Sequence, residues 1–445
     1  MSRKPRSTPS PVPQSRLGRL MRIGLAAGEL AIGGAVEGLR RLGDSGSADS
    51  GSVFLTGAAA RRLAERLSRL RGAAMKLGQL FSIEGRDMVP PEFSEALAIL
   101  RASATPMPLA QLKRVLGREW GAGWESRFAE FDFEPIAAAS IGQVHRARTS
   151  DGRDLALKIQ YPGVARSIDS DVDNVASLLR LARLLPAQID FRGIISEAKR
   201  QLHQEADYLA EARFLARYRK LVADEPRLVV PRVHRDLTTR RILAMDYVEG
   251  EPLEAIAGAD VTQAERDTIG ASLEHLLFRE LFEFRVMQTD PNFANYLWDR
   301  SGKRMVLLDF GSTREFPSDF VEKYRRICRS ILKHDRAGVR RGAIEIGYLD
   351  PDASPAEADA VIDVILLVCE PLTHRGPYDF PHADLPSRAR SLGFDLAIRK
   401  GLLRPPPPET IFLHRKLVGA FFILARIGAR VNAHALVKPF LEERG

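Results

Sequence analysis

The sequence is poor in cysteine and contains no long, uninterrupted hydrophobic run. Its 445 residues include only two cysteines, Cys328 and Cys369. Two thiols supply neither a disulfide framework nor a set of metal ligands, so we expect a reducing compartment. A membrane-spanning helix needs roughly 18–20 apolar residues. The nearest candidate, residues 23–39, is interrupted by Glu29 and Glu37.

Acidic residues are absent from positions 1–22, which are basic. These residues also lack the hydrophobic segment of a secretory signal, so we interpret them as a disordered arm or a transit-like peptide. Residues 16–42 are predicted to form a helix rich in small residues, which either lies on a membrane surface or packs against the rest of the protein. The net charge of +9 indicates an anionic partner (nucleotide, nucleic acid or anionic membrane) or a general solubility charge.

Hydrophobic periodicity predicts an α+β protein in which a small mixed region precedes a larger helical one. Residues 53–118 show helical spacing, and residues 168–220 do so again. Between them, residues 136–148 and 154–160 are predicted to form a β-hairpin around a turn at 150–152. The remainder is predicted to be mostly helical, with short strands at 240–248, 296–298 and 305–308. A mixed lobe followed by a helical lobe is the order found in protein kinases.

The spacing of three polar residues in the second half is typical of a phosphoryl-transfer centre. Asp290 is followed after four residues by Asn295, and Asp309-Phe310-Gly311 comes behind an apolar run. Phosphoryl transfer needs a carboxylate near the attacking oxygen and oxygen donors that hold magnesium against the phosphates. We therefore predict that Asp290 is the catalytic carboxylate and that Asn295 and Asp309 bind Mg²⁺. Each motif alone is weak, but their combination in this order is specific.

Lys158 lies in the apolar segment 155–159, which is predicted to be a strand. A lysine on the third strand of a kinase contacts the ATP phosphates and pairs with a helix glutamate. A phosphate-binding loop is predicted just before it, with nucleotide contacts from Ala137, Ala138, Ala139, Ser140, Ile141, Gly142 and Val144. Most kinases have glycines here, so that backbone N–H groups can approach the phosphates. Alanine disfavours positive φ, so we expect a stiffer loop that holds the nucleotide differently.

Residues 244–250 are predicted to form the hinge that meets the adenine, with contacts from Met245, Asp246 and Val248. The tetrapeptide His234-Arg235-Asp236-Leu237 matches the sequence motif of a kinase catalytic loop. However, no asparagine follows it at the required spacing, and it precedes the strand predicted at 240–248. We interpret it as a turn in the small lobe.

The ion-pair partner of Lys158 has two candidates in the helical region, Glu205 and Glu211. Both lie some fifty residues beyond the lysine. Residues 161–190 are therefore predicted to be an inserted helical element.

These motifs resemble one family, the UbiB-type atypical kinases, also called aarF-domain or ADCK kinases. Lys76-Leu77-Gly78-Gln79 matches the family's K-x-G-Q element, and Glu205-Ala206-Asp207 matches its E-x-D element. Residues 137–142 match its alanine-rich loop. Gln288-Thr289-Asp290-Pro291-Asn292 departs from the common His-Ala-Asp-Pro-His form and looks like the coenzyme Q branch, as do residues 159–164 and 413–416. The resemblance covers residues 57–438.

The resemblance implies a protein-kinase-like bilobal fold with an added helical K-x-G-Q domain, which covers the place where a peptide substrate would dock. The corresponding domains are a basic arm, helix and linker (1–52), a K-x-G-Q extension (53–130), a small lobe with a helical insertion (131–250) and a helical lobe (251–445). It further implies that Lys76 and Gln79 reach into the active site, with Lys76 near Glu205 and Asp207. Lys158 would then pair with Glu211.

The leading functional hypothesis is an atypical kinase that binds ATP and Mg²⁺ and acts as an ATPase in support of ubiquinone biosynthesis. One alternative is a nucleotide-gated scaffold or chaperone for lipids, and a less favoured one is a conventional protein kinase. The expected partners are anionic membrane lipids, lipids like quinone precursors and other ubiquinone-biosynthesis enzymes, with no nucleic acid. An oligomer is compatible with this hypothesis. We expect a bacterial cytoplasmic protein peripheral to the inner membrane, or alternatively one on the matrix side of the mitochondrial inner membrane.

Overall fold

The computed structural model describes residues 73, 76–77, 106–181, 192–258, 260–394 and 407–442. The chain divides into two compact units. The first takes in the chain up to Arg213 and again Arg232–Tyr247, and the second takes in Phe214–Pro231 and the chain from Val248 onward. Gln79, the basic arm and the helix predicted at 16–42 lie outside the described residues. Among the described helices, none combines the length and the hydropathy needed to cross a bilayer.

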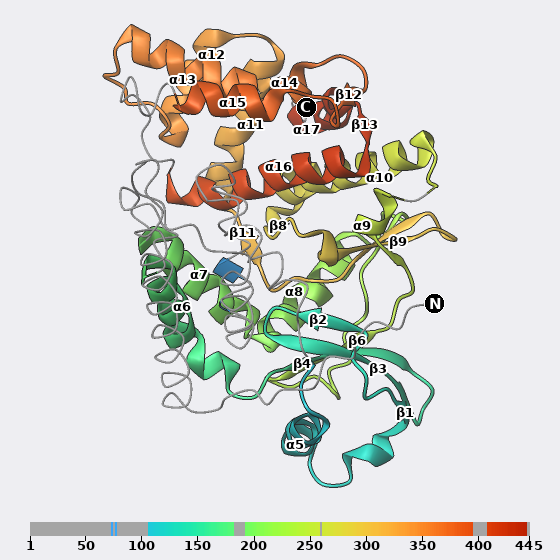
Figure 1. The fold of residues 1–445 in the computed structure, drawn as a ribbon. Helices are drawn as coiled ribbons and strands as arrows, with labels where there is room; N and C mark the ends of the chain where they lie inside the picture. Colours follow the sequence, from blue (N-terminus) through green and yellow to red (C-terminus); the bar gives the residue numbers. More distant parts are fainter. Residues whose placement is uncertain are drawn as a thin grey trace, which may run out of the picture. The chain divides into compact units, whose positions relative to one another are not determined.

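An antiparallel sheet forms the centre of the first unit (Figure 1). Its strands follow the order β1 (Phe128–Phe131), β3 (Gly142–Thr149), β4 (Asp154–Gln160) and β6 (Ile242–Asp246), and the short β2 (Ala137–Ala139) pairs with β3. In β4, Leu155, Leu157 and Ile159 are buried in one cluster with residues of helix α5 (Leu109–Trp120). Alternation along the strand places Lys158 on the opposite face from this cluster.

The strand predicted at 136–148 is in fact two strands, so that prediction was wrong. The chain turns at Ser140 and Ile141. Strand β2 then pairs with β3, with Ala137 opposite Val144 and Ala139 opposite Gly142. The turn brings Gly142 so close to β4 that a Cβ there would lie 2.3 Å from the carbonyl oxygen of Ile159. Glycine therefore permits the close approach of the two strands. The turn predicted at 150–152 is confirmed, with Gly152 at φ 91°.

Three helices follow β4 along the described chain: α6 (Val164–Leu181), α7 (Arg192–Glu205) and α8 (Tyr208–Leu221). They confirm the helical region predicted at 168–220. Asp207 lies between α7 and α8, and its side chain accepts the backbone N–H of Ala210 at 2.9 Å. This is an N-terminal cap, and it explains why a new helix begins directly after the first one ends. Helix α8 belongs to the first unit up to Arg213 and to the second from Phe214.

The described part of the second unit is mainly helical and contains three small sheets. Strands β9 (Tyr296–Asp299) and β10 (Arg304–Leu307) confirm the strands predicted near 296–298 and 305–308. They form a sheet with β5 (Leu228–Val229) and β7 (Glu251–Pro252). Strands β8 (Val286–Gln288) and β11 (Thr313–Glu315) pair, as do β12 (Tyr378–Asp379) and β13 (Arg430–Val431). These extra strands were not predicted, because two or three residues are too few to show an alternating pattern.

Two helices of the second unit begin at a Ser/Thr N-terminal cap. Thr262 accepts the N–H of Glu265 at the start of α10 (Gln263–Phe278), and Ser354 does the same for Glu357 at α13 (Pro355–Val368). Both are Ser/Thr-x-x-Glu sequences. Helix α10 continues into a π-helical segment, η3 (Arg279–Phe284), and runs beside α16 (Pro408–Ile427) (Figure 1). The remaining elements are η2 (Trp124–Arg127) in the first unit and α9 (Leu253–Ile256), η4 (Phe293–Asn295), α11 (Ser318–Leu332), α12 (Arg336–Ile346), α14 (Glu370–Thr373), α15 (Leu385–Phe394) and α17 (Ala433–Leu441).

Candidate functional site

The β4 lysine forms a buried ion pair in the first unit. Lys158 Nζ donates to both carboxylate oxygens of Glu211, at 2.9 and 3.1 Å, and the two side chains are 8% and 0% exposed. Of the two candidate partners, the structure therefore pairs Lys158 with Glu211 on α8. The ammonium group also lies 5.3 Å from the centre of the Tyr208 ring. A charge this well buried needs such a partner, because an unpaired one would be strongly disfavoured.

Glu205, the other candidate, has different partners. It forms an ion pair with Lys76, which is completely buried, and accepts a hydrogen bond from the hydroxyl of Ser140. Glu205 thus links the K-x-G-Q lysine to the turn of the alanine-rich hairpin. Asp207, two residues on, caps α8 as described above. Gln79 lies outside the described residues.

The alanine-rich segment is a strand rather than an open loop. Ala137, Ala138 and Ala139 pair with β3, and the N–H of Ile136 donates to the carbonyl of Val144 at 2.8 Å. Val144 in turn lies opposite Lys158 in the ladder between β3 and β4. This places the predicted nucleotide contacts Ser140, Ile141 and Gly142 at the tip of a β-hairpin. Alanine disfavours positive φ, so a stiffer tip than a glycine-rich one remains a prediction.

The predicted hinge begins at the end of β6. Met245 is buried within the strand, Asp246 ends it, and Val248 is the first residue of the second unit. The carboxylate of Asp246 accepts the backbone N–H of Arg232 at 3.0 Å and Nε2–H of His234 at 2.7 Å. Its side chain therefore fixes the chain that precedes β6.

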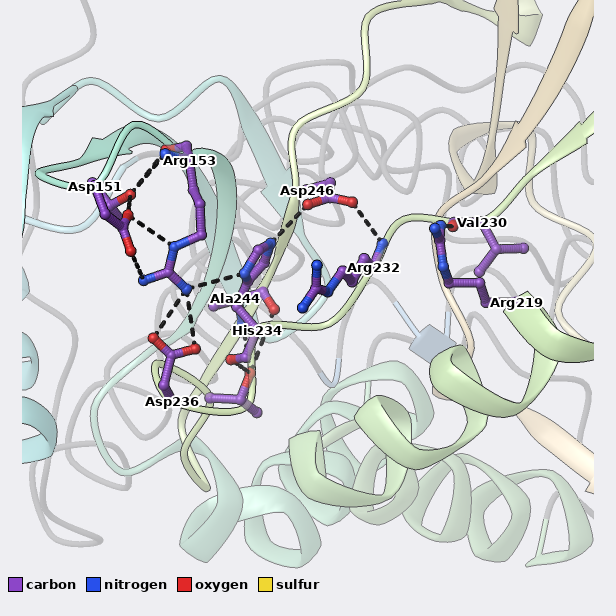
Figure 2. A network of polar contacts seen from close by, with 11 residues as sticks. Asp151, Arg153, Arg219, Val230, Arg232, His234, Asp236, Ala244 and Asp246 are labelled. Carbon is purple, nitrogen blue, oxygen red and sulfur yellow. Dashed lines mark hydrogen bonds and ion pairs between the residues drawn. The ribbon is translucent and has the colours of Figure 1, made fainter.

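The tetrapeptide His234-Arg235-Asp236-Leu237 is a turn of the first unit, as predicted. Arg153, from the turn between β3 and β4, donates to the carboxylate of Asp236 at 3.0 and 3.1 Å and to Nδ1 of His234 at 3.2 Å. These contacts are drawn in Figure 2. Arg153 also binds Asp151. These contacts give the kinase-like tetrapeptide a structural role far from the predicted catalytic residues in the sequence.

The residues of the predicted phosphoryl-transfer centre lie together in the second unit. Asn295 Nδ2 donates to the backbone carbonyl of Asp290 at 3.0 Å, and the N–H of Leu308, just before Asp309, donates to the carbonyl of Asn295 at 3.0 Å. Asp309 Oδ1 accepts the N–H of Gly311 at 2.9 Å, which fixes its carboxylate. The glycine of the Asp-Phe-Gly motif thus orients the aspartate.

The chemistry of these donors fits magnesium. Since Asn295 Nδ2 is used on the backbone, Oδ1 is the amide atom left to act as a ligand. Asp309 supplies a carboxylate, and Mg²⁺ in nucleotide enzymes is typically held by one or two such protein groups together with phosphates and water. No group of three or more His, Cys, Asp or Glu side chains in the described ranges forms a complete metal cage.

Sequence reasoning used two basic residues of α16 only as a family match and assigned them no role in the site, although both contact the segment that carries Asp290. Arg415 Nη2 donates to Asp290 Oδ1 at 2.6 Å, and Lys416 Nζ donates to Tyr296 Oη at 3.1 Å. Burial alone would lower the pKa of Lys416, but Glu280 and Tyr296 outweigh it and raise the pKa above its ordinary value. For the Glu280 carboxyl, burial raises the pKa, and the charge of Lys416 partly offsets this rise. The sequence signal that could have indicated a role in the site is the pair of adjacent positive charges within a largely apolar helix.

Comparison with known proteins identifies the family. Residues 99–343 match the ABC1 atypical kinase-like domain. The chain belongs to the ABC1 atypical kinase-like family. It is 38% identical over 433 residues to the atypical kinase COQ8B of Rattus norvegicus, covering 97% of this chain and 81% of the relative. It is 37% identical over 434 residues to the atypical kinase COQ8 of Saccharomyces cerevisiae, covering 96% and 85%. Both relatives are described as mitochondrial.

A solved structure supports the fold of this family member. The structure of Rv3197 in complex with erythromycin, from Mycobacterium tuberculosis, aligns with a TM-score of 0.62 and 27% identity, covering 87% of this chain and 97% of that one. The predicted family, its coenzyme Q branch and the α+β kinase-like fold are therefore confirmed. The individual roles of the site residues remain predictions.

Proposed function

We propose that this ABC1-family protein binds Mg-ATP and hydrolyses it in support of coenzyme Q biosynthesis. The family assignment and the COQ8 relatives support the pathway. The observation that carries the nucleotide proposal is the buried pair of Lys158 and Glu211, with Nζ held 2.9 Å from Oε1. A lysine fixed in this way is the phosphate-binding group that a kinase fold uses.

Each remaining group has a role that its surroundings suit. Asn295 and Asp309 would hold Mg²⁺, which when bound neutralises charge on the phosphates. Asp290 would orient a water molecule or a hydroxyl group for attack. The hairpin tip at Ser140 to Gly142 would contact the phosphates, and the backbone around Met245 would meet the adenine.

Replacing Asp309 with asparagine tests the nucleotide proposal. The variant should lose much of the thermal stabilisation that Mg-ADP gives the wild type, because the amide replaces a charged magnesium ligand with a neutral one. Affinity should fall by roughly tenfold or more, which removes about 1.4 kcal/mol of ligand-dependent stabilisation. Asp352→Asn is the matched control, since Asp352 is exposed on the second unit. Wild-type affinity in D309N would exclude this assignment.

The acceptor of the phosphoryl group and the site of action need separate tests. We propose water as the acceptor and an anionic membrane surface, with lipids like quinone precursors, as the place of action. Phosphate release by the full chain should rise when anionic phospholipid vesicles are added. Nucleotide binding without release under either condition would instead favour the alternative of a nucleotide-gated scaffold. Unchanged levels of coenzyme Q and its precursors in a deletion strain would exclude the pathway.

A further inference from the structure

Helix α16 contacts the segment that carries Asp290 at three points. We infer that Arg415, Lys416 and Gly419 of this helix are positioning residues, which hold the catalytic loop (residues 288–296) in place. This inference rests on the proposed function, because it assigns the loop a role in ATP turnover. All of the contacts that support it lie within the second unit.

The first contact is the ion pair of Arg415 with Asp290. Its N–O distance is 2.6 Å, and the side chains are 5% and 14% exposed. Arg415 Nε and Nη1 are also buried and have no hydrogen-bond partner among the described residues. Burying unpaired donors is unfavourable, and buried ion pairs add little net stability. Stability alone therefore does not account for this arginine, whereas orientation of the Asp290 carboxylate does.

The second contact ties both ends of the loop to one ammonium group. Lys416 Nζ lies 3.3 Å from Gln288 Oε1 and 3.1 Å from Tyr296 Oη. Gln288 precedes Asp290 by two residues, and Tyr296 directly follows Asn295. Lys416 therefore holds the loop just before the predicted catalytic residue and just after the predicted magnesium ligand.

The π-helical segment η3 provides the carboxylate that pairs with Lys416. It presents Glu280, whose carboxylate lies 3.3 Å from Lys416 Nζ and accepts the N–H of Gln288 at 3.1 Å. Glu280 also accepts the hydroxyl of Tyr218 at 2.9 Å. Wider π-helical turns of this kind occur often at functional sites. The fully buried Glu280 thus fixes the lysine and the start of the loop together.

The third contact is steric. Gly419 lies one helical turn beyond Arg415, on the same face of α16. A Cβ at this position would lie 2.0 Å from Cγ and 2.1 Å from Cβ of Pro291, the residue after Asp290. Because proline is part of the loop backbone, the loop would have to move to admit even a methyl group. Helix and loop therefore fit at van der Waals distance.

Amide hydrogen exchange of the full chain tests whether α16 holds the catalytic loop, and it does not require ATP turnover. Exchange at residues 288–296 should rise by roughly tenfold or more in Arg415→Gln and in Gly419→Ala, because the loop loses its attachment to α16. Arg426→Gln is the matched control, since Arg426 is exposed on the same helix. Unchanged exchange at 288–296 in both variants would overturn the inference. So would an equal rise throughout the second unit, which would indicate a merely structural role.

Steady-state kinetics then test whether Arg415 acts through Asp290. Arg415→Gln should lower kcat about tenfold to a hundredfold with little change in the KM for ATP, and Arg415→Lys should recover part of the loss. In an Asp290→Asn background, Arg415→Gln should have no further effect. Additive losses, or a change in KM alone, would contradict the inference. Absence of both Mg-ADP stabilisation and phosphate release in the wild-type protein would refute the proposed function. The exchange result would still decide whether α16 holds the catalytic loop in place.

Discussion

Replacing Lys158 with methionine should destabilise the first unit by about 3 kcal/mol or more. The substitution preserves much of the side-chain volume but removes the cation that faces Glu211. The side chain of Glu211 is fully buried, so its carboxylate would stay buried after losing the Lys158 ammonium group. Removing one member of a buried ion pair typically costs about 3–5 kcal/mol, because the remaining charge has lost its compensation.

Urea unfolding followed by tryptophan fluorescence measures this effect. Trp120 and Trp124 lie in the core of the first unit, so a Trp298→Phe background confines the signal to that unit. The double variant Lys158→Met with Glu211→Leu should recover most of the loss, since two apolar residues of similar volume can replace a buried pair. It therefore separates the cost of an unpaired charge from the cost of altered packing.

Lys199→Met is the matched control. Lys199 forms a 2.7 Å ion pair with Asp173 in the same unit, but the two side chains are 26% and 59% exposed. Such pairs contribute about 1 kcal/mol or less. If Lys158→Met loses no more stability than Lys199→Met, then burial does not set the strength of the Lys158–Glu211 interaction, and our reasoning fails.

Three further predictions address the tetrapeptide 234–237, the β2–β3 hairpin and the buried Glu274. Asp236→Asn should leave ATP hydrolysis within about twofold of wild type, whereas Asp290→Asn should lower it by roughly a hundredfold or more; equal losses in a phosphate-release assay would contradict both assignments. Gly142→Ala should cost about 1–3 kcal/mol in urea unfolding, because its Cβ would lie 2.3 Å from the carbonyl oxygen of Ile159. Burial raises the pKa of Glu274 from 4.5 to about 7, so Glu274→Gln should gain stability relative to wild type as the pH rises from 5 to 8, approaching roughly 3 kcal/mol.

The sign of the Glu274 effect follows from proton binding. In the folded protein the Glu274 carboxyl stays protonated up to about pH 7, whereas in the unfolded chain it loses its proton near pH 4.5. Wild-type stability from this group is therefore fully present below pH 4.5 and is lost as the pH rises through about 7. A glutamine does not titrate, so a difference between the variants that stays constant from pH 5 to 8 would show that Glu274 does not behave in this way. For the hairpin, Gly193→Ala is the control, because no described residue comes within 4 Å of its Cβ position.

The sequence by itself identified the family and predicted the chemistry of the site. The order and spacing of Asp290, Asn295 and Asp309 predicted a phosphoryl-transfer centre, and the K-x-G-Q and alanine-rich motifs predicted the family that the comparisons confirm. It also identified Asp236 as part of a turn, because the tetrapeptide lacks a following asparagine. All of these inferences depend on residues close together in the chain, whose spacing the backbone geometry fixes.

Only the tertiary structure decided which distant residues meet. Glu211 lies 53 residues beyond Lys158, and Arg415 lies 125 residues beyond Asp290. Whether Glu205 or Glu211 reaches the lysine depends on where Asp207 ends one helix and starts the next. Whether Arg415 faces the loop depends on how closely Gly419 lets α16 approach Pro291. Such contacts follow from helix packing and strand register, and a local hydrophobic pattern does not specify them.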